Sequence, residues 1–82
     1  MTLLNWVAKK GFNYYYIGSI AIDFYDTSMQ EWCTSNCNGK WVAELLRIDT
    51  KNKTVGGIHN MVRHIILFEI ESDYTWFVCK WE

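Results

Sequence analysis

The chain has 82 residues, of which 50% are hydrophobic and 17% aromatic, and its formal net charge is −1 at pH 7. A chain of this length buries too little surface for two separate cores, so we expect one domain spanning residues 1–82. The hydrophobic content excludes a disordered chain, and no apolar run approaches the roughly 20 residues that a membrane-spanning helix needs. We therefore expect no membrane contact.

Charge and cysteine content indicate which partners and which cellular compartment to expect. Eight Lys and Arg residues stand against nine Asp and Glu residues, whereas a nucleic-acid binder of this size usually has a basic excess. The N-terminus lacks the basic and apolar regions of a signal peptide, which predicts a cytoplasmic protein, in the host cytoplasm if the source is viral. Three cysteines are an odd number without an export signal, so we expect reduced thiols and no disulfide framework.

The N-terminal residues predict a helix of about two turns. Thr2 is a suitable N-cap, and Leu3, Leu4 and Val7 share one helical face. Gly11 can take the left-handed conformation that ends many helices.

Residues 12–25 are aromatic and β-branched, which favours strand. Two interpretations fit this segment. A two-residue turn at Gly18 and Ser19 would make a hairpin, while the alternation through Gly18 also fits one long strand. We favour the hairpin, in which Tyr14 and Tyr16 lie on the face away from the core.

Capping-box spacings predict a second helix, with Thr27 followed by Gln30 and Ser28 by Glu31. This helix should end in the polar run 34–36.

Residues 41–49 fit either a helix face or a strand. We choose the strand, because the polar residues after it resemble a turn that leads into a returning strand ending at Val55.

The last twenty residues predict a hairpin that turns at Ser72 and Asp73. Its core face would pair Phe68 with Phe77, and its outer face would carry Tyr74 and Trp76. The other pairs predicted on the core face are Ile66 with Cys79, Ile70 with Thr75, and His64 with Trp81. The predicted fold is therefore α+β, with a small antiparallel sheet of about five or six strands and one or two short helices packed on one side.

The Cys, His and carboxylate residues could in principle form a metal site or a catalytic site. Thiolates and imidazoles are the ligands that zinc prefers, and Cys33, Cys37, His59 and His64 have spacings seen in structural zinc sites. The stretch between the two pairs is longer than in a zinc finger and lacks its pattern, so we expect no metal and no cofactor. No local signature selects a Cys–His pair or a carboxylate pair for catalysis, and we expect no enzyme.

The aromatic content is the most informative feature for function. Five Trp, five Tyr and four Phe exceed what so small a core can bury completely. Tyr and Trp are enriched among interface hot spots, so we expect Tyr14, Tyr16, Tyr74 and Trp76 to bind a partner. The alternative is that a helix, a second sheet or a twin subunit in a homodimer covers these side chains.

These observations predict a non-enzymatic protein-binding module whose partner is a protein. Short chains without a catalytic signature are often inhibitors, and many are encoded by phages or viruses against host machinery, as anti-CRISPR and other anti-defence proteins are. The alternatives are a domain that binds single-stranded nucleic acid through the same aromatic side chains, and a small domain supported by zinc.

Overall fold

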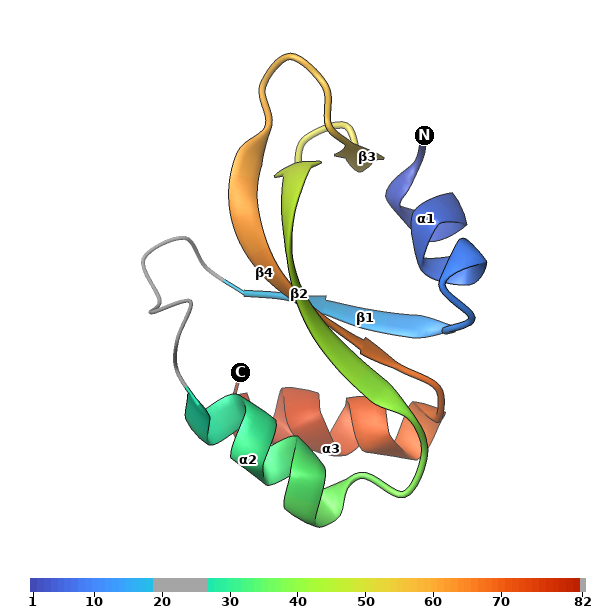
Figure 1. Ribbon diagram of the computed structural model, residues 1–82, viewed down its shortest axis with the longest axis vertical. Coiled ribbons are helices and arrows are strands. Elements are labelled where there is room, and N and C mark those ends of the chain that lie inside the picture. The colour runs from blue at the N-terminus through green and yellow to red at the C-terminus, as the bar shows by residue number, and fades with distance from the viewer. Residues whose placement is uncertain (19–26, 82) are drawn as a thin grey trace.

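A computed structural model describes residues 1–18 and 27–81, which form an α+β fold with one antiparallel sheet (Figure 1). The elements are α1 (Leu3–Lys9), β1 (Tyr14–Ile17), α2 (Thr27–Asn36), β2 (Trp41–Asp49), β3 (Thr54–Val55), β4 (Met61–Phe68) and α3 (Glu71–Trp81). The α+β class is confirmed. The sheet has four strands in the described residues rather than five or six, mainly because the predicted C-terminal strand is a helix.

The strand order is β1-β4-β2-β3, and every neighbouring pair is antiparallel. β4 therefore lies inside the sheet, with β1 on one side and β2 on the other. Its residues 65–68 are buried without interruption, although successive side chains of a strand point to opposite faces. Both faces of the sheet must consequently be covered.

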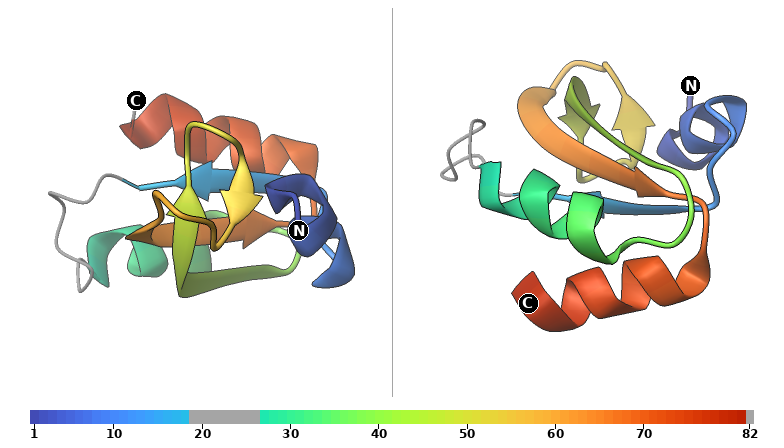
Figure 2. Two further views of the ribbon diagram at one scale, coloured as in Figure 1. Left: turned by 90° about the horizontal axis from the view of Figure 1, so that it is seen from above. Right: turned by 60° about the horizontal axis from the view of Figure 1, so that its bottom comes forward.

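Two clusters of buried side chains provide this cover, one on each face (Figure 2). α1 packs on one face, and α2 and α3 pack on the other, so the expectation of helices on one side only is wrong. The α1-side core contains Leu3, Val7, Ile48, Ile65 and Leu67. The α2–α3-side core contains Met29, Cys33, Ile66, Phe68 and Phe77.

The predicted C-terminal hairpin is wrong, because residues Glu71–Trp81 form the helix α3. Ser72 and Asp73 lie in the first turn of this helix and not at a hairpin tip. Two acidic residues, Glu71 and Asp73, occupy that turn, where negative charge is favourable beside the exposed N–H groups of a helix.

The buried residues of α3 recur at helical spacing. Asp73 and Phe77 are buried and Tyr74 and Trp81 are half-buried, whereas Cys79, predicted to face the core opposite Ile66, is exposed. The predicted cross-strand pairs Ile70 with Thr75 and His64 with Trp81 are also wrong, because residues Glu71–Trp81 form a helix and not a strand. Phe68 and Phe77 do meet, with ring centroids 5.2 Å apart, through packing of α3 on β4.

The N-terminal helix is confirmed, with one correction to its buried face. The hydroxyl of Thr2 accepts a hydrogen bond from the Asn5 N–H at 3.2 Å, and Gly11 has φ +87°. Leu3 and Val7 are buried, but Leu4 is 66% exposed. Only two of the three predicted side chains therefore face the sheet.

The strand at 41–49 and the strand returning through Val55 are confirmed as β2 and β3. The Asp49 carboxylate accepts hydrogen bonds from the N–H groups of Lys51 and Asn52, at 3.0 and 3.1 Å, and closes the turn between these strands. Hydrogen bonds from Asn52 and then Lys51 hold the pKa of this carboxyl below its usual range.

The predicted helix after Thr27 is confirmed as α2, and it ends at Asn36 inside the predicted polar run. β1 confirms strand for 14–17, but the choice between a hairpin and one long strand depends on residues 19–26, which lie outside the described residues. Of the helices in residues 1–18 and 27–81, none is long and apolar enough to cross a membrane.

Candidate functional site

Three of the four aromatic residues predicted to bind a partner pack against the core. The rings of Tyr14 and Tyr74 stack with centroids 5.7 Å apart, and Tyr16 meets Phe77 edge-on at 5.0 Å. All three tyrosines are half-buried against the α2–α3-side core. The expectation that they face away from the core is wrong, because α3 covers this face of β1.

Trp76 is the fourth predicted residue, and its side chain is 68% exposed. It lies on α3, one turn before Lys80 and next to buried Phe77. Trp76 thus points outward as predicted, although from a helix rather than from a strand.

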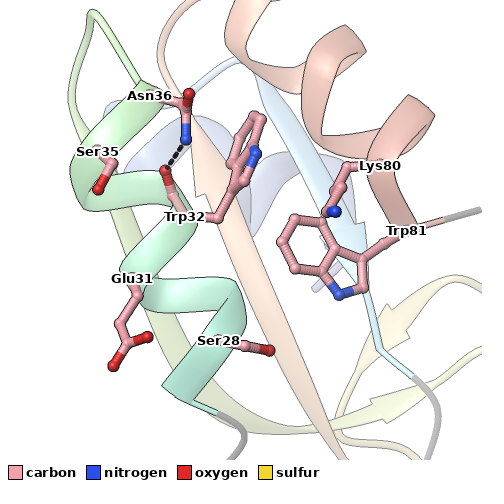
Figure 3. Close-up of a pocket in the computed structure, with 7 residues that line it drawn as sticks. All are labelled: Ser28, Glu31, Trp32, Ser35, Asn36, Lys80 and Trp81. Atoms are coloured by element: carbon pink, nitrogen blue, oxygen red, sulfur yellow. Dashed lines mark hydrogen bonds between the residues drawn. The ribbon is translucent and has the colours of Figure 1, made fainter.

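A groove lies between α2 and α3, on the side of the sheet where these aromatic residues pack (Figure 3). Its volume is about 650 Å³, and it is lined by Ser28, Glu31, Trp32, Ser35, Asn36, Lys80 and Trp81. The indoles of Trp32 and Trp81 face one another between the helices, with ring centroids 5.6 Å apart and planes at 84°. The Lys80 ammonium lies 5.8 Å from the Trp81 ring centroid.

A second cavity of about 170 Å³ adjoins the first at Asn36, which lines both. Its other lining residues are Asn38, Ser72, Asp73 and Trp76. We call the two cavities together the α2–α3 groove. Three of the five tryptophans of the chain, Trp32, Trp76 and Trp81, therefore line one surface.

The walls of the groove are held by the aromatic core and by a buried carboxylate. Trp81 stacks on Phe77 at 4.8 Å, and Trp32 meets the same ring edge-on at 5.8 Å. Asp73 is 3% exposed, and its carboxylate accepts hydrogen bonds from the N–H groups of Asn38, at 3.0 and 3.1 Å, and of Gly39, at 2.9 Å. These bonds tie the loop after α2 to the first turn of α3.

Glycine at position 39 allows the loop after α2 to lie close to the Ile70 side chain. A Cβ atom at this position would lie 2.5 Å from side-chain atoms of Ile70. The sequence marks Gly39 only as a turn residue, and no local signal shows that Asp73 receives its N–H group.

Besides the buried Asp73, the described residues of the groove place one exposed charge on each helix. Glu31 lies on the α2 wall and Lys80 on the α3 wall, and both side chains are exposed. The Asn36 side-chain amide donates to the Trp32 carbonyl oxygen at 2.9 Å, which holds the Asn36 side chain against the last turn of α2. The groove thus presents tryptophan faces between polar rims of opposite charge.

The four metal candidates lie in different parts of the fold, two of them in elements and two in loops. Cys33 and Cys37 lie at the end of α2, where the Cys37 N–H donates to the Cys33 carbonyl oxygen at 2.9 Å. His64 is buried on β4, and His59 is exposed in the loop before it. Among residues 1–18 and 27–81, no three His, Cys, Asp or Glu side chains are grouped so that they could hold a metal ion.

The three thiols differ in environment, and we expect them to differ in reactivity. Burial, together with Cys37, raises the pKa of the Cys33 thiol to about 12, and burial followed by Asp73 raises the pKa of Cys37. Cys79 is exposed. Because the thiolate is the nucleophile, iodoacetamide at pH 8 should alkylate Cys79 first, Cys37 more slowly, and Cys33 only on unfolding.

Peptide mass spectrometry over time measures this order, and the same reaction in denaturant, where all three thiols should react alike, is the control. Labelling of native Cys33 as fast as Cys79 would contradict the packing of α2.

No protein family model matches the chain, and searches of curated proteins and of solved structures found no significant match.

Proposed function

We propose that this chain is a non-enzymatic protein-binding module that contacts its partner through the α2–α3 groove. One observation carries the proposal. Trp76 is 68% exposed beside a groove walled by Trp32 and Trp81, and tryptophan is the residue most typical of interface hot spots. A large apolar side chain exposed next to a groove with polar rims is the pattern expected of a docking surface.

The chemistry of the groove favours a protein segment as its occupant. An apolar side chain of the partner would rest on the surface formed by Trp32 and Trp81, whose rings contact one another edge to face at 84°. A basic group beside it would meet Glu31 and an acidic group would meet Lys80, on opposite walls. Hydroxyl and amide groups along the rim supply further hydrogen bonds, as they do in protein interfaces.

The charged groups of the groove suit ion pairing with a protein partner. In the described part of the chain these groups are Glu31, Asp73 and Lys80, and the Asp73 carboxylate is engaged by the backbone of the loop after α2. The other two, Glu31 and Lys80, are exposed on opposite walls, where each can pair with a charged group of the partner. The further expectation of a phage- or virus-encoded inhibitor, such as an anti-CRISPR protein, derives from chain length and sequence and stays a prediction.

Trp76→Ala should weaken partner binding strongly without unfolding the protein. Because Trp76 is exposed, its replacement should change the free energy of unfolding by no more than about 0.5 kcal/mol. Loss of an interface hot spot of about 2 kcal/mol would reduce capture of the partner roughly 30-fold. The measurement compares wild-type and variant proteins as bait in host lysate, with captured proteins quantified by mass spectrometry.

Leu4→Ala is the matched control. Leu4 is 66% exposed, which is close to Trp76, but it lies on α1 across the sheet, so this change should leave capture intact. Equal capture by wild-type and Trp76→Ala proteins would contradict the proposal. Binding of single-stranded oligonucleotides that weakens with salt and is lost in Trp76→Ala would replace it by the nucleic-acid alternative.

A further inference from the structure

The outer edge of β2 is free over most of its length. β3 pairs only with Ile48 and Asp49, at the far end of the strand. Along residues 41–46, β2 has β4 on one side and no other strand of the described part of the chain on the opposite side. In Figure 1 β2 lies in front of β4 and β1, and the view from above places it at the boundary of the fold (Figure 2).

Two backbone hydrogen bonds show which groups point outward. The Lys40 carbonyl accepts from the Glu69 N–H on the β4 side, at 3.0 Å, whereas the Arg47 carbonyl accepts from the Gly56 N–H on the β3 side, at 2.8 Å. In an antiparallel strand the N–H and C=O groups of alternate residues point to the same side. Those of Trp41, Ala43 and Leu45 therefore point away from β4.

No strand of the described residues receives these outward groups, and such an edge is a template for pairing with another chain. The side chains along the same edge alternate between the faces. Val42 belongs to the α1-side core, and the Glu44 carboxylate lies 3.6 Å from the Lys10 ammonium at the end of α1. Trp41 and Ala43 lie on the opposite face, against the α2–α3-side core.

We propose that two copies of the chain join their β2 edges in an antiparallel pair centred on Val42. In this register Trp41 lies opposite Ala43 of the partner subunit, so the outward groups of both residues form hydrogen bonds across the interface. The two sheets become one continuous sheet. The inference is independent of the function proposed for the α2–α3 groove.

Charge complementarity favours a second copy of the chain as the partner of the β2 edge, and it favours the register centred on Val42. With Val42 at the centre, Lys40 lies opposite Glu44 of the partner subunit, and the two-fold axis makes this ion pair twice. The Glu44 carboxylate uses Oε2 for Lys10, which leaves Oε1 for the new pair. A pairing centred on Glu44 would place two carboxylates together, and one centred on Ala43 would place Glu44 against Val42.

The side chains of the other face fit the same register. Trp41 would cover Ala43 of the partner subunit, a large residue against a small one. Leu45, which is 51% exposed, would lie opposite Gly39 of the partner subunit and rest against the apolar Ile70 side chain that covers this glycine. A second copy of this chain therefore matches the edge in hydrogen bonds, charge and side-chain size.

Variants that reverse one charge of the Lys40–Glu44 pair, or exchange both, test this pairing directly. Sedimentation equilibrium measures the dimer dissociation constant of each, at protein concentrations up to the millimolar range. Lys40→Glu and Glu44→Lys should each weaken dimerisation by about tenfold or more, because each replaces two attractive contacts by two repulsive ones. The double variant with both changes restores opposite charges across the interface and should recover the wild-type dissociation constant. Lys51→Glu, in the exposed turn before β3, is the matched control and should leave dimerisation unchanged.

Amide hydrogen exchange of the wild-type protein provides a second test that needs no substitution. Exchange at Trp41 and Ala43 should slow as concentration rises, while exchange at Lys51 should not change. A wild-type protein that is monomeric at every concentration would overturn the proposal. So would a dimer that is indifferent to both single reversals, or one that the double variant fails to restore. None of these changes touches Trp32, Trp76 or Trp81, so failure here leaves the proposed function standing.

Discussion

Phe77→Ala is expected to lower the free energy of unfolding by about 3–5 kcal/mol, the loss typical of a buried phenylalanine. Phe77 is fully buried, and its ring contacts those of four other residues. Their centroids lie 4.8–5.8 Å away and belong to Tyr16, Trp32, Phe68 and Trp81. Removal of this ring leaves a cavity where α2, α3 and the sheet meet.

Equilibrium denaturation with urea measures the loss, and two further variants define its origin. Phe77→Leu keeps most of the buried volume and should lose much less stability than Phe77→Ala. Thr75→Ala, at an exposed position of the same helix, should change the free energy of unfolding by less than about 0.5 kcal/mol. A loss below about 1 kcal/mol for Phe77→Ala would contradict the packing of α3 on the sheet.

Asp73→Ala should cost about 2–4 kcal/mol, because it removes the acceptor of hydrogen bonds to a charged group and leaves two backbone donors without a partner. These donors are the N–H groups of Asn38 and Gly39, which Asp73 ties to the first turn of α3. The change should also loosen the end of the groove that Trp76 lines.

The matched control is Glu71→Ala, which removes an exposed acidic residue from the same helical turn. This change removes the favourable charge at the start of the helix and an exposed hydrogen bond from the Tyr14 hydroxyl at 3.4 Å, and it should cost about 0.3–1 kcal/mol. Asp73→Asn keeps one acceptor oxygen and should lie between the two in stability. If Asp73→Ala and Glu71→Ala had equal effects in urea denaturation, the carboxylate of Asp73 would not be the tie between α2 and α3.

Elements with strong local signals are predicted correctly from the sequence. Thr2 and Gly11 mark the two ends of α1, and the capping-box residues after Thr27 mark the start of α2. The polar turn closed by Asp49 connects β2 to β3 where it was expected. At the start of α1 and in the Asp49 turn, side chains of neighbouring residues accept hydrogen bonds from the backbone N–H groups.

The C-terminal helix is missed because two periodicities fit the same residues. Trp76, Phe77 and Val78 are residue types enriched in strands, and alternate positions of the segment are apolar. Tyr74, Phe77 and Trp81 also recur at helical spacing, and packing of this face against β1 and β4 decides the outcome. Tertiary contacts thus override the local preference of the segment for strand.

In the candidate site, too, features set by nearby residues could be predicted from the sequence, whereas contacts between distant residues could not. Trp76 points outward in the hairpin as well as in the helix, so its exposure could be predicted from an incorrect element. Trp32 and Trp81 come together only when α2 and α3 pack on one face of the sheet. No pattern in the sequence relates these two residues, which is why the groove could not be predicted.

Site-specific photo-cross-linking is the most direct test of the proposal that the α2–α3 groove binds a protein partner. Benzoylphenylalanine in place of Trp76 keeps a large aromatic side chain at the rim of the groove, and the same group in place of Lys51 lies at the exposed turn before β3. Irradiation in host lysate should attach one partner protein at position 76, and the Trp32→Ala change should remove that adduct. An adduct that forms at position 51 and not at 76, or one at 76 that contains only a second copy of the chain, would contradict the proposal.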